Sequence, residues 1–220
     1  MKFIKFILIL LTFYYFQQNL KAQNRFGILG GLSISNYTGK DFPKTYLPKI
    51  GIAAGFFIEG EITNPFSIVA ELNFEQKGVK YWYQPLPLTE VTINSNLDYF
   101  SIPIYVKAAF GRKLGYYAYA GTVISYLISN SYSAYSTEND REVSWEPYFN
   151  YGFNKFDAGL AIGFGMVFKE IFLDLRYVHG IKNIYSGENI PDIRNQMISF
   201  KAGFSIYKRK LSNCYQTRRR

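Results

Sequence analysis

The chain has 220 residues, 19% of them aromatic and 19% charged, with a formal net charge of +9 at pH 7. The excess positive charge lies at the two ends: residues 23–207 hold 16 basic and 16 acidic side chains, so the fold has no basic face for nucleic acid. A single cysteine, Cys214, excludes a disulfide framework, and a single histidine, His179, excludes a typical zinc site.

The first 22 residues have the layout of a secretory signal peptide. Lys2 and Lys5 form a short positive region, an apolar run follows over 6–16, and Ala22 offers a small residue at a cleavage point. The apolar run is too short to span a bilayer as a helix. We therefore expect an exported protein from which residues 1–22 are removed; an uncleaved interfacial anchor is the alternative.

Eight later segments alternate apolar and polar residues with a period of two, which is typical of β-strands. In chain order they cover residues 25–37, 50–62, 66–77, 97–110, 116–128, 156–169, 171–178 and 197–207. Segment 156–169 shows the clearest alternation, whereas 116–128 is apolar on both faces and its register stays open.

The connections between these segments alternate in length. Long loops are expected over 38–49, 78–96, 129–155 and 179–196, and short turns over 63–65, 111–115 and 169–170. Short turns at one end and long loops at the other are typical of transmembrane β-barrels of the outer membrane.

The two faces of the predicted strands differ in size as well as polarity. One face carries Ile, Leu and Phe, which suits lipid, while the other combines charged residues with Gly, Ala and Ser, which suits the narrow interior of an eight-stranded barrel. We predict an all-β fold, an eight-stranded antiparallel up-and-down transmembrane β-barrel over 23–207, in the outer membrane of a Gram-negative cell. Residues 208–220 form a basic tail, either solvated in the periplasm or in contact with acidic lipid headgroups or a partner.

Charged residues on the predicted inner face nearly balance, which favours a network of ion pairs that plugs the barrel. A small ion-conducting pore is the alternative. The predicted network comprises Glu59, Glu61, Glu71, Glu75, Lys77, Lys107, Asp157, Lys169, Asp174, Arg176 and Lys201.

Several short motifs follow one another along the mature chain in a characteristic order. They are Gly30-Gly31-Leu32-Ser33, Glu71-Leu72 to Lys77-Gly78, Tyr99-Phe100-Ser101-Ile102-Pro103 with Lys107, Ala120-Gly121, the 157–165 strand, and Arg176-Tyr177 with Gly180-Ile181-Lys182-Asn183-Ile184. In this order and spacing the chain resembles the PorT-like family of outer-membrane β-barrel proteins. The resemblance implies an eight-stranded barrel in the outer membrane and a link to the assembly of a protein secretion and gliding system. The chain departs from the family pattern in continuing for 13 residues after Tyr207.

Catalytic and metal-binding groups are sparse. Acyl chemistry would use His179 as a base with Ser186 as nucleophile, and Asp192 or Glu188 to orient the ring. Calcium would require the loop carboxylates Glu138, Asp140, Glu142 and Glu146, which lack the spacing of a calcium loop. We expect no enzyme activity, no metal and no cofactor.

The leading functional hypothesis is a structural or interaction barrel that is embedded in outer-membrane lipid. Its loops 78–96 and 129–155 are expected to meet another envelope or secretion protein. Two alternatives remain: a soluble exported barrel that holds an apolar ligand inside, and a lipid-modifying enzyme that depends on His179.

Overall fold

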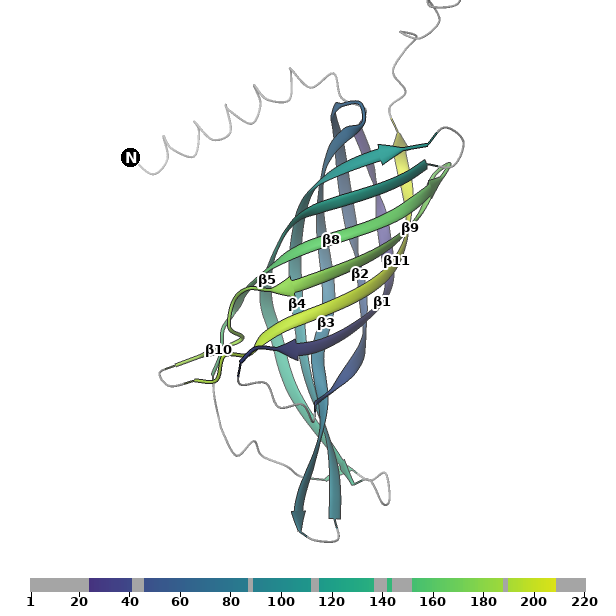
Figure 1. Ribbon diagram of the computed structural model, residues 1–220. Helices are drawn as coiled ribbons and strands as arrows, with labels where there is room; N and C mark the ends of the chain where they lie inside the picture. Colours follow the sequence, from purple (N-terminus) through teal and green to yellow (C-terminus); the bar gives the residue numbers. More distant parts are fainter. Residues whose placement is uncertain are drawn as a thin grey trace, which may run out of the picture.

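The structure, a computed structural model, describes residues 24–40, 46–86, 89–111, 115–136, 142–143, 152–187 and 190–208. Each long strand pairs antiparallel with the next, and the last returns to pair with the first, which closes a barrel (Figure 1). The eight barrel strands are β1 (Asn24–Thr38), β2 (Tyr46–Thr63), β3 (Phe66–Leu86), β4 (Thr89–Phe110), β5 (Gly115–Ser136), β8 (Phe156–Phe168), β9 (Ile171–Gly180) and β11 (Arg194–Lys208). The predicted eight-stranded antiparallel barrel is confirmed.

Three two-residue strands lie outside the ring. The first, β6 (Glu142–Val143), pairs with the end of β5, and β7 (Gly152–Phe153) pairs with β10 (Tyr185–Ser186). Both pairings lie at the end of the barrel where the long connections gather (Figure 1). The short turns, the start of β1 and the end of β11 lie together at the opposite end, which is the periplasmic end of such barrels.

The outer surface of the barrel is apolar and its interior polar. On β8, Ile162 and Phe164 are 59% and 61% exposed, whereas Asp157 and Ala161 are buried. The 13 residues of β8, at about 3.3 Å each and tilted by about 45°, cross about 30 Å, the thickness of a bilayer's hydrocarbon core. Because the aliphatic face points outward, the alternative of a soluble barrel with an apolar interior is wrong.

Strand β5 takes the register that the sequence leaves open. Tyr117 and Tyr119 point into the lumen, the interior of the barrel, while Tyr116 and Ile124 point outward. Both faces look apolar in the sequence because the lumen is lined here by tyrosines, whose hydroxyl groups bond to the charged residues opposite. Toward the extracellular end, Ile128 has no partner in β4, and this irregularity shifts the alternation by one residue. Odd-numbered residues of β5 point inward up to Leu127, whereas even-numbered residues such as Ala134 point inward beyond it.

The predicted loop over 78–96 is wrong, because β3 and β4 continue through it as a paired hairpin. This hairpin and the outer part of β5 project beyond the rest of the barrel (Figure 1). The apolar residues change faces on the way out: Phe74 points outward, whereas Val79 and Ile93 are buried on the inner side. Where a strand leaves the lipid and enters water, its apolar residues belong on the inner face instead of the outer one. The apolar residues therefore move from one set of alternate positions to the other, and in the sequence the segment does not look like a continuation of the same strand.

The other predicted strands lie where expected, with most ends extended by one to four residues. Segment 137–141 and segment 144–151 of the predicted 129–155 loop lie outside the described residues, as do the predicted signal peptide and residues 209–220 of the tail. Within the described part of the chain, no helix has the length and apolar character needed to cross a membrane.

Candidate functional site

The lumen is filled by side chains from all eight barrel strands. Nine of the eleven residues predicted to line it take part in ion pairs there, namely Glu59, Glu71, Glu75, Lys77, Lys107, Asp157, Asp174, Arg176 and Lys201. These contacts form three layers along the barrel axis, described below from the middle outward.

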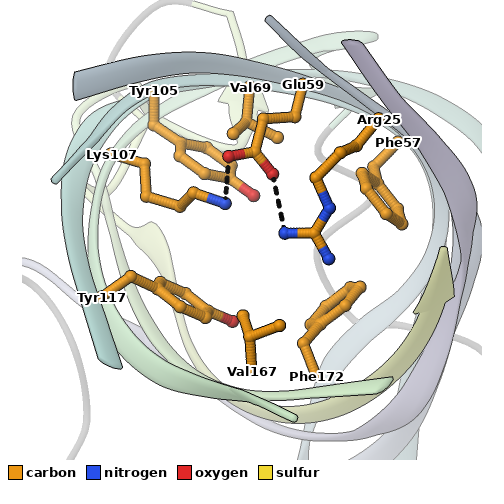
Figure 2. Close-up of a pocket in the computed structure, with 9 residues that line it drawn as sticks. All are labelled: Arg25, Phe57, Glu59, Val69, Tyr105, Lys107, Tyr117, Val167 and Phe172. Carbon is orange, nitrogen blue, oxygen red and sulfur yellow. Dashed lines mark hydrogen bonds and ion pairs between the residues drawn. The ribbon is translucent and has the colours of Figure 1, made fainter. Parts of the chain in front are cut away.

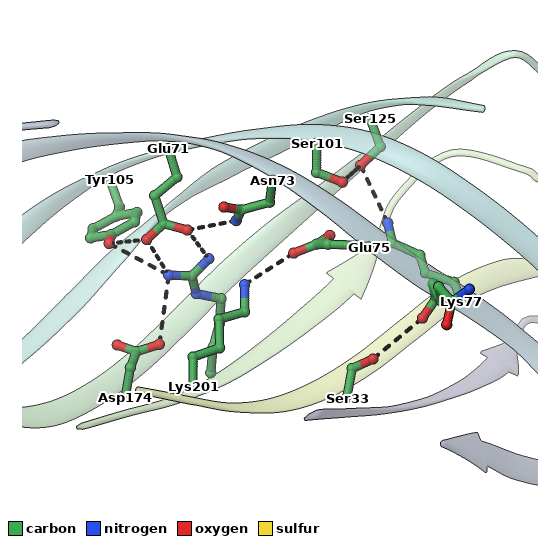
Figure 3. A network of polar contacts seen from close by, with 12 residues as sticks. Ser33, Glu71, Asn73, Glu75, Lys77, Ser101, Tyr105, Ser125, Asp174 and Lys201 are labelled. Atoms are coloured by element: carbon green, nitrogen blue, oxygen red, sulfur yellow. Dashed lines mark hydrogen bonds and ion pairs between the residues drawn. The ribbon is translucent and has the colours of Figure 1, made fainter. Parts of the chain in front are cut away.

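The middle layer is built around Arg176 of β9. Its guanidinium donates to both carboxylate oxygens of Glu71, from Nη1 at 2.8 Å and from Nη2 at 2.6 Å (Figure 3). Its Nε donates to the Tyr119 hydroxyl at 2.7 Å. Asp174 lies 3.6 Å from the same guanidinium and accepts a hydrogen bond from Tyr119 at 2.8 Å. Tyr105 donates to Glu71 as well. One cation is thus shared by two carboxylates, with tyrosine hydroxyls and the amide of Asn73, which donates to Glu71 at 2.7 Å, supplying further bonds.

The layer toward the extracellular end contains two lysines. Lys201 lies 3.1 Å from Glu75, and Lys77 lies 3.3 Å from the Ser125 hydroxyl (Figure 3). Lys77 also lies 3.4 Å from Asp157. Asn195 donates to Asp157 at 2.9 Å. All of these groups are buried, and each charged group has an opposite charge beside it. The pairing offsets the energetic cost of removing the charges from water.

The layer at the periplasmic end joins Arg25, Glu59 and Lys107. Lys107 Nζ lies 2.5 Å from Glu59 Oε1, and Arg25 Nη1 lies 3.5 Å from Glu59 Oε2. Arg25 Nη2 also donates to the Ser205 hydroxyl at 2.8 Å. Figure 2 shows the two cationic ends converging on the interior of the barrel, with an open space beside them.

An apolar cluster closes the extracellular mouth above these layers. It contains Ile184 and Ile193, which are 2% and 5% exposed and come from the β9–β11 connection. Asn154 holds this connection by donating to the carbonyls of Asn183 and Tyr185 at 3.0 and 2.6 Å. The rest of the cluster comes from β1, β3, β4 and β5: Tyr37, Val79, Leu97, Tyr99 and Leu127.

Two small cavities lie within this packing. One of about 20 Å³ lies beside Arg25 and Lys107, and one of about 10 Å³ lies beside Lys77 and Asp157. Each is large enough for about one water molecule. Neither is of the size that an apolar ligand would need, which agrees with the outward position of the aliphatic face.

Several inward-facing glycines allow aromatic rings to lie flat against the barrel wall. A Cβ atom on Gly163 would lie 2.3 Å from the Tyr119 ring, and one on Gly165 would lie 2.4 Å from the Tyr117 ring. Phe172 covers Gly203 in the same way, at 2.0 Å. Each ring therefore occupies a notch that only glycine leaves open.

Two residues of the predicted network lie elsewhere. Lys169 is exposed in the β8–β9 turn, where its φ is 56° and its ammonium lies 5.5 Å from the centre of the Phe168 ring. Its predicted position in the lumen is wrong, because β8 ends one residue earlier, at Phe168. Glu61 is half-buried near the periplasmic end of β2, and the ion pairs found among the described residues do not include it.

Arg25 is a charged lumen residue that the predicted network omits. Arg25 shares the odd-numbered, inward-facing positions of β1 with Leu29 and Ser33. This position in the alternation could have placed Arg25 in the predicted network. The structural role of Tyr105, Tyr117 and Tyr119 also escapes the sequence, because a tyrosine on an alternating strand fits either face.

Of the residues in the hypothetical acyl-transfer site, His179 and Ser186 each bond to a group outside it. His179 is exposed on the outer face, with its Nδ1 3.2 Å from the Tyr177 hydroxyl. The Ser186 hydroxyl donates to the Gly152 carbonyl, and Asp192 accepts from Arg194. The side chain of Glu188 lies outside the described residues.

No group of three or more metal-ligating side chains occurs among the residues described. The calcium candidates Glu138, Asp140 and Glu146 lie outside the described chain, and the side chain of Glu142 is likewise not described.

Comparison with known proteins gives both a family and a fold. The family model for the outer membrane protein beta-barrel domain matches residues 16–186. The outer membrane protein OprG from Pseudomonas aeruginosa is similar over 86% of this chain and 99% of its own, with a TM-score of 0.50 and 9% identity, a likeness of fold alone. Neisserial surface protein A is similar over 81% of this chain and 96% of its own (TM-score 0.42, 13% identity). The attachment invasion locus protein Ail of Yersinia pestis is similar over 83% and 99% (TM-score 0.40, 14% identity). No curated protein matches.

Proposed function

Because this chain belongs to the outer membrane protein beta-barrel domain family, we propose that it acts there as a non-enzymatic interaction protein rather than as a pore or an acyltransferase. The barrel lies in the outer membrane, with its apolar outer face in lipid. Its function is then carried by what it presents at the two ends.

The packing of the lumen supports a role without conduction. Three layers of paired charges and an apolar cluster at the mouth fill the interior, and the cavities beside Lys77 and Lys107 are each of single-water size. An ion crossing the barrel would have to separate Arg176 from Glu71 in a buried layer, at a large energetic cost.

The sheet that projects beyond the membrane is the observation that carries the proposal. Its inner side is apolar, with Val91 and Ile93 buried, and its outer side presents polar side chains around Trp82, which is 58% exposed. A large exposed aromatic side chain surrounded by polar groups is typical of a protein-binding surface. We propose that this sheet, over 78–96 and the outer part of β5, contacts another envelope protein.

The class of partner that we propose is a component of a secretion system. This step rests on the order and spacing of the PorT-like motifs in the sequence. The exported form without residues 1–22 and a solvated periplasmic tail over 208–220 belong to the same proposal.

The test is site-specific photocrosslinking in intact cells. A photoreactive residue at Trp82 is expected to give a discrete protein adduct, whereas the same residue at the lipid-facing Phe164 of β8 gives none. Both variants should fractionate with the outer membrane and migrate differently on gels before and after boiling. Folded protein that gives no adduct at Trp82 and at its surface neighbour Lys80, or that conducts ions steadily in planar bilayers, would contradict the proposal.

A further inference from the structure

We propose that the periplasmic end of the lumen contains a binding site for a carboxylate anion, in the cavity beside Arg25 and Lys107. This site lies at the opposite end of the barrel from the projecting sheet and is independent of the partner proposed for that sheet.

Two cations at this site share one carboxylate. Lys107 lies 2.5 Å from Glu59, while the contact from Arg25 to the same carboxylate is long, at 3.5 Å. The other bond of the guanidinium goes to the neutral Ser205 hydroxyl, and Arg25 Nε is buried without any acceptor. A guanidinium with an unused donor beside an ammonium is the arrangement that binds a planar oxyanion through two or more charge-assisted hydrogen bonds.

The walls of the cavity make a missing countercharge costly. Apart from the three charged groups, the lining consists of five apolar or aromatic side chains, shown in Figure 2: Phe57, Val69, Tyr105, Val167 and Phe172, with Tyr117 completing the ring. The Tyr117 hydroxyl is already committed to Asp174, 3.1 Å away in the middle layer. In such surroundings, excess positive charge is weakly solvated, and an anion that enters replaces the lost hydration.

The other charged groups at this end do not fill the site. Glu61 has the same inward phase as Glu59 but lies outside the cavity lining, nearer the solvent. Lys169 and Glu170 are exposed in the β8–β9 turn. Asp174 of the middle layer also attracts Lys107, but it is shared with Arg176 and with the hydroxyls of Tyr117 and Tyr119, and it does not line the cavity. Within the lining, two cations therefore face the single carboxylate of Glu59.

Size and access select the ligand. The cavity, of about 20 Å³, holds about one water molecule, so a ligand can place one oxygen of a flat carboxylate in it while the rest of the ligand stays on the periplasmic side; a tetrahedral phosphate is broader and fits less well. Arg25, Val167 and Phe172 lie one or two residues from the short-turn ends of their strands, inside the ring of strands. The site is therefore reached from the aqueous periplasm and not from the lipid, and its natural ligand is a carboxylate of a periplasmic molecule.

The test measures the thermal unfolding of the full barrel, refolded in detergent micelles, against the concentration of sodium acetate at constant ionic strength. Sodium phosphate and sodium chloride are the comparison anions. We expect acetate to raise the unfolding temperature in a saturable way, corresponding to an increase of roughly tenfold in the folded-to-unfolded ratio at about ten times its dissociation constant. Phosphate and chloride should have smaller effects.

Three variants separate the site from general surface electrostatics. Arg25→Gln removes the unused donor and should abolish the acetate effect, and Lys169→Gln removes an exposed charge at the same end and should leave it unchanged. Val167→Leu fills the cavity while keeping both cations and should also abolish it, which keeps the test open if Arg25→Gln fails to fold. An acetate effect that is absent from the unmodified protein, that equals the phosphate and chloride effects, or that persists in Val167→Leu would overturn the proposal.

Discussion

Replacement of Arg176 by methionine is expected to be the most damaging single change in the lumen. The guanidinium makes two hydrogen bonds to Glu71, at 2.8 and 2.6 Å, and one to Tyr119, and it also lies 3.6 Å from Asp174. Arg176→Met leaves two buried carboxylates without their shared cation. Removing one partner of a buried ion pair costs about 3–5 kcal/mol, and the free energy of unfolding should fall by that amount.

The matched control removes the other partner. Glu71→Gln keeps the shape of the side chain and leaves Arg176 next to Asp174, so no charge is stranded and the loss should be smaller, about 1–3 kcal/mol. The double variant Glu71→Gln with Arg176→Met should be more stable than Arg176→Met alone, because only Asp174 then remains without the cation.

The assay is urea-induced unfolding of the barrel in lipid vesicles, followed by tryptophan fluorescence and by the heat-dependent gel shift. A loss below about 1 kcal/mol in Arg176→Met would refute the reasoning, since the layer would then tolerate two unpaired carboxylates. A greater loss in Glu71→Gln than in Arg176→Met would also refute it, because the shared cation would not be the central group.

Three further predictions, with Lys169→Gln as the control for the first, use the same unfolding assay, and the last adds an activity measurement. Phe164→Arg, on the lipid-facing side of β8, should cost about 2–4 kcal/mol in vesicles, whereas Lys169→Gln in the exposed turn should stay within about 0.5 kcal/mol; equal effects would contradict the outward position of Phe164. Gly163→Ala places a Cβ 2.3 Å from the Tyr119 ring and should cost about 1–3 kcal/mol; an unchanged stability would show that the ring is free to move. His179→Ala should leave stability and any phospholipase activity of the preparation unchanged, and a loss of activity would revive the acyl-transfer hypothesis.

The barrel could be predicted from the sequence because a strand between lipid and a narrow polar lumen must alternate strictly. Ile162 and Phe164 with Asp157 show that alternation in β8, and neighbouring strands repeat it. The projecting sheet could not be predicted, because the alternation changes phase after Phe74 as the strand enters water. A search for strands that allows one such reversal would join 66–77 to the residues after it.

The candidate site could be predicted only as a set of inward charges. Nine members of that set are found in ion pairs, because a position on a strand determines which face a side chain takes. The partners were beyond prediction: Arg176 bonds to Glu71 across the lumen, 105 residues away, and such pairings depend on barrel closure and strand stagger. Lys169 was misplaced because one residue at a strand end decides between the lumen and solvent.

The ring-and-notch contacts in the lumen have a consequence for how such a barrel can diverge. Tyr119 fits only while position 163 has no side chain, and the same holds for Tyr117 with Gly165 and for Phe172 with Gly203. At position 203 the three nearest atoms to an added Cβ belong to the Phe172 ring, so a larger residue there becomes acceptable once residue 172 has become smaller, and a single change leaves the lumen either overfilled or hollow. At positions 163 and 165 a Cβ would also lie 2.8 and 2.2 Å from the backbone carbonyl oxygens of Leu175 and Leu173, so a smaller residue in place of the tyrosine does not make room. Descendants of this sequence should therefore exchange residues 172 and 203 as a pair and keep glycine at 163 and 165, while the lipid-facing residues between them vary independently.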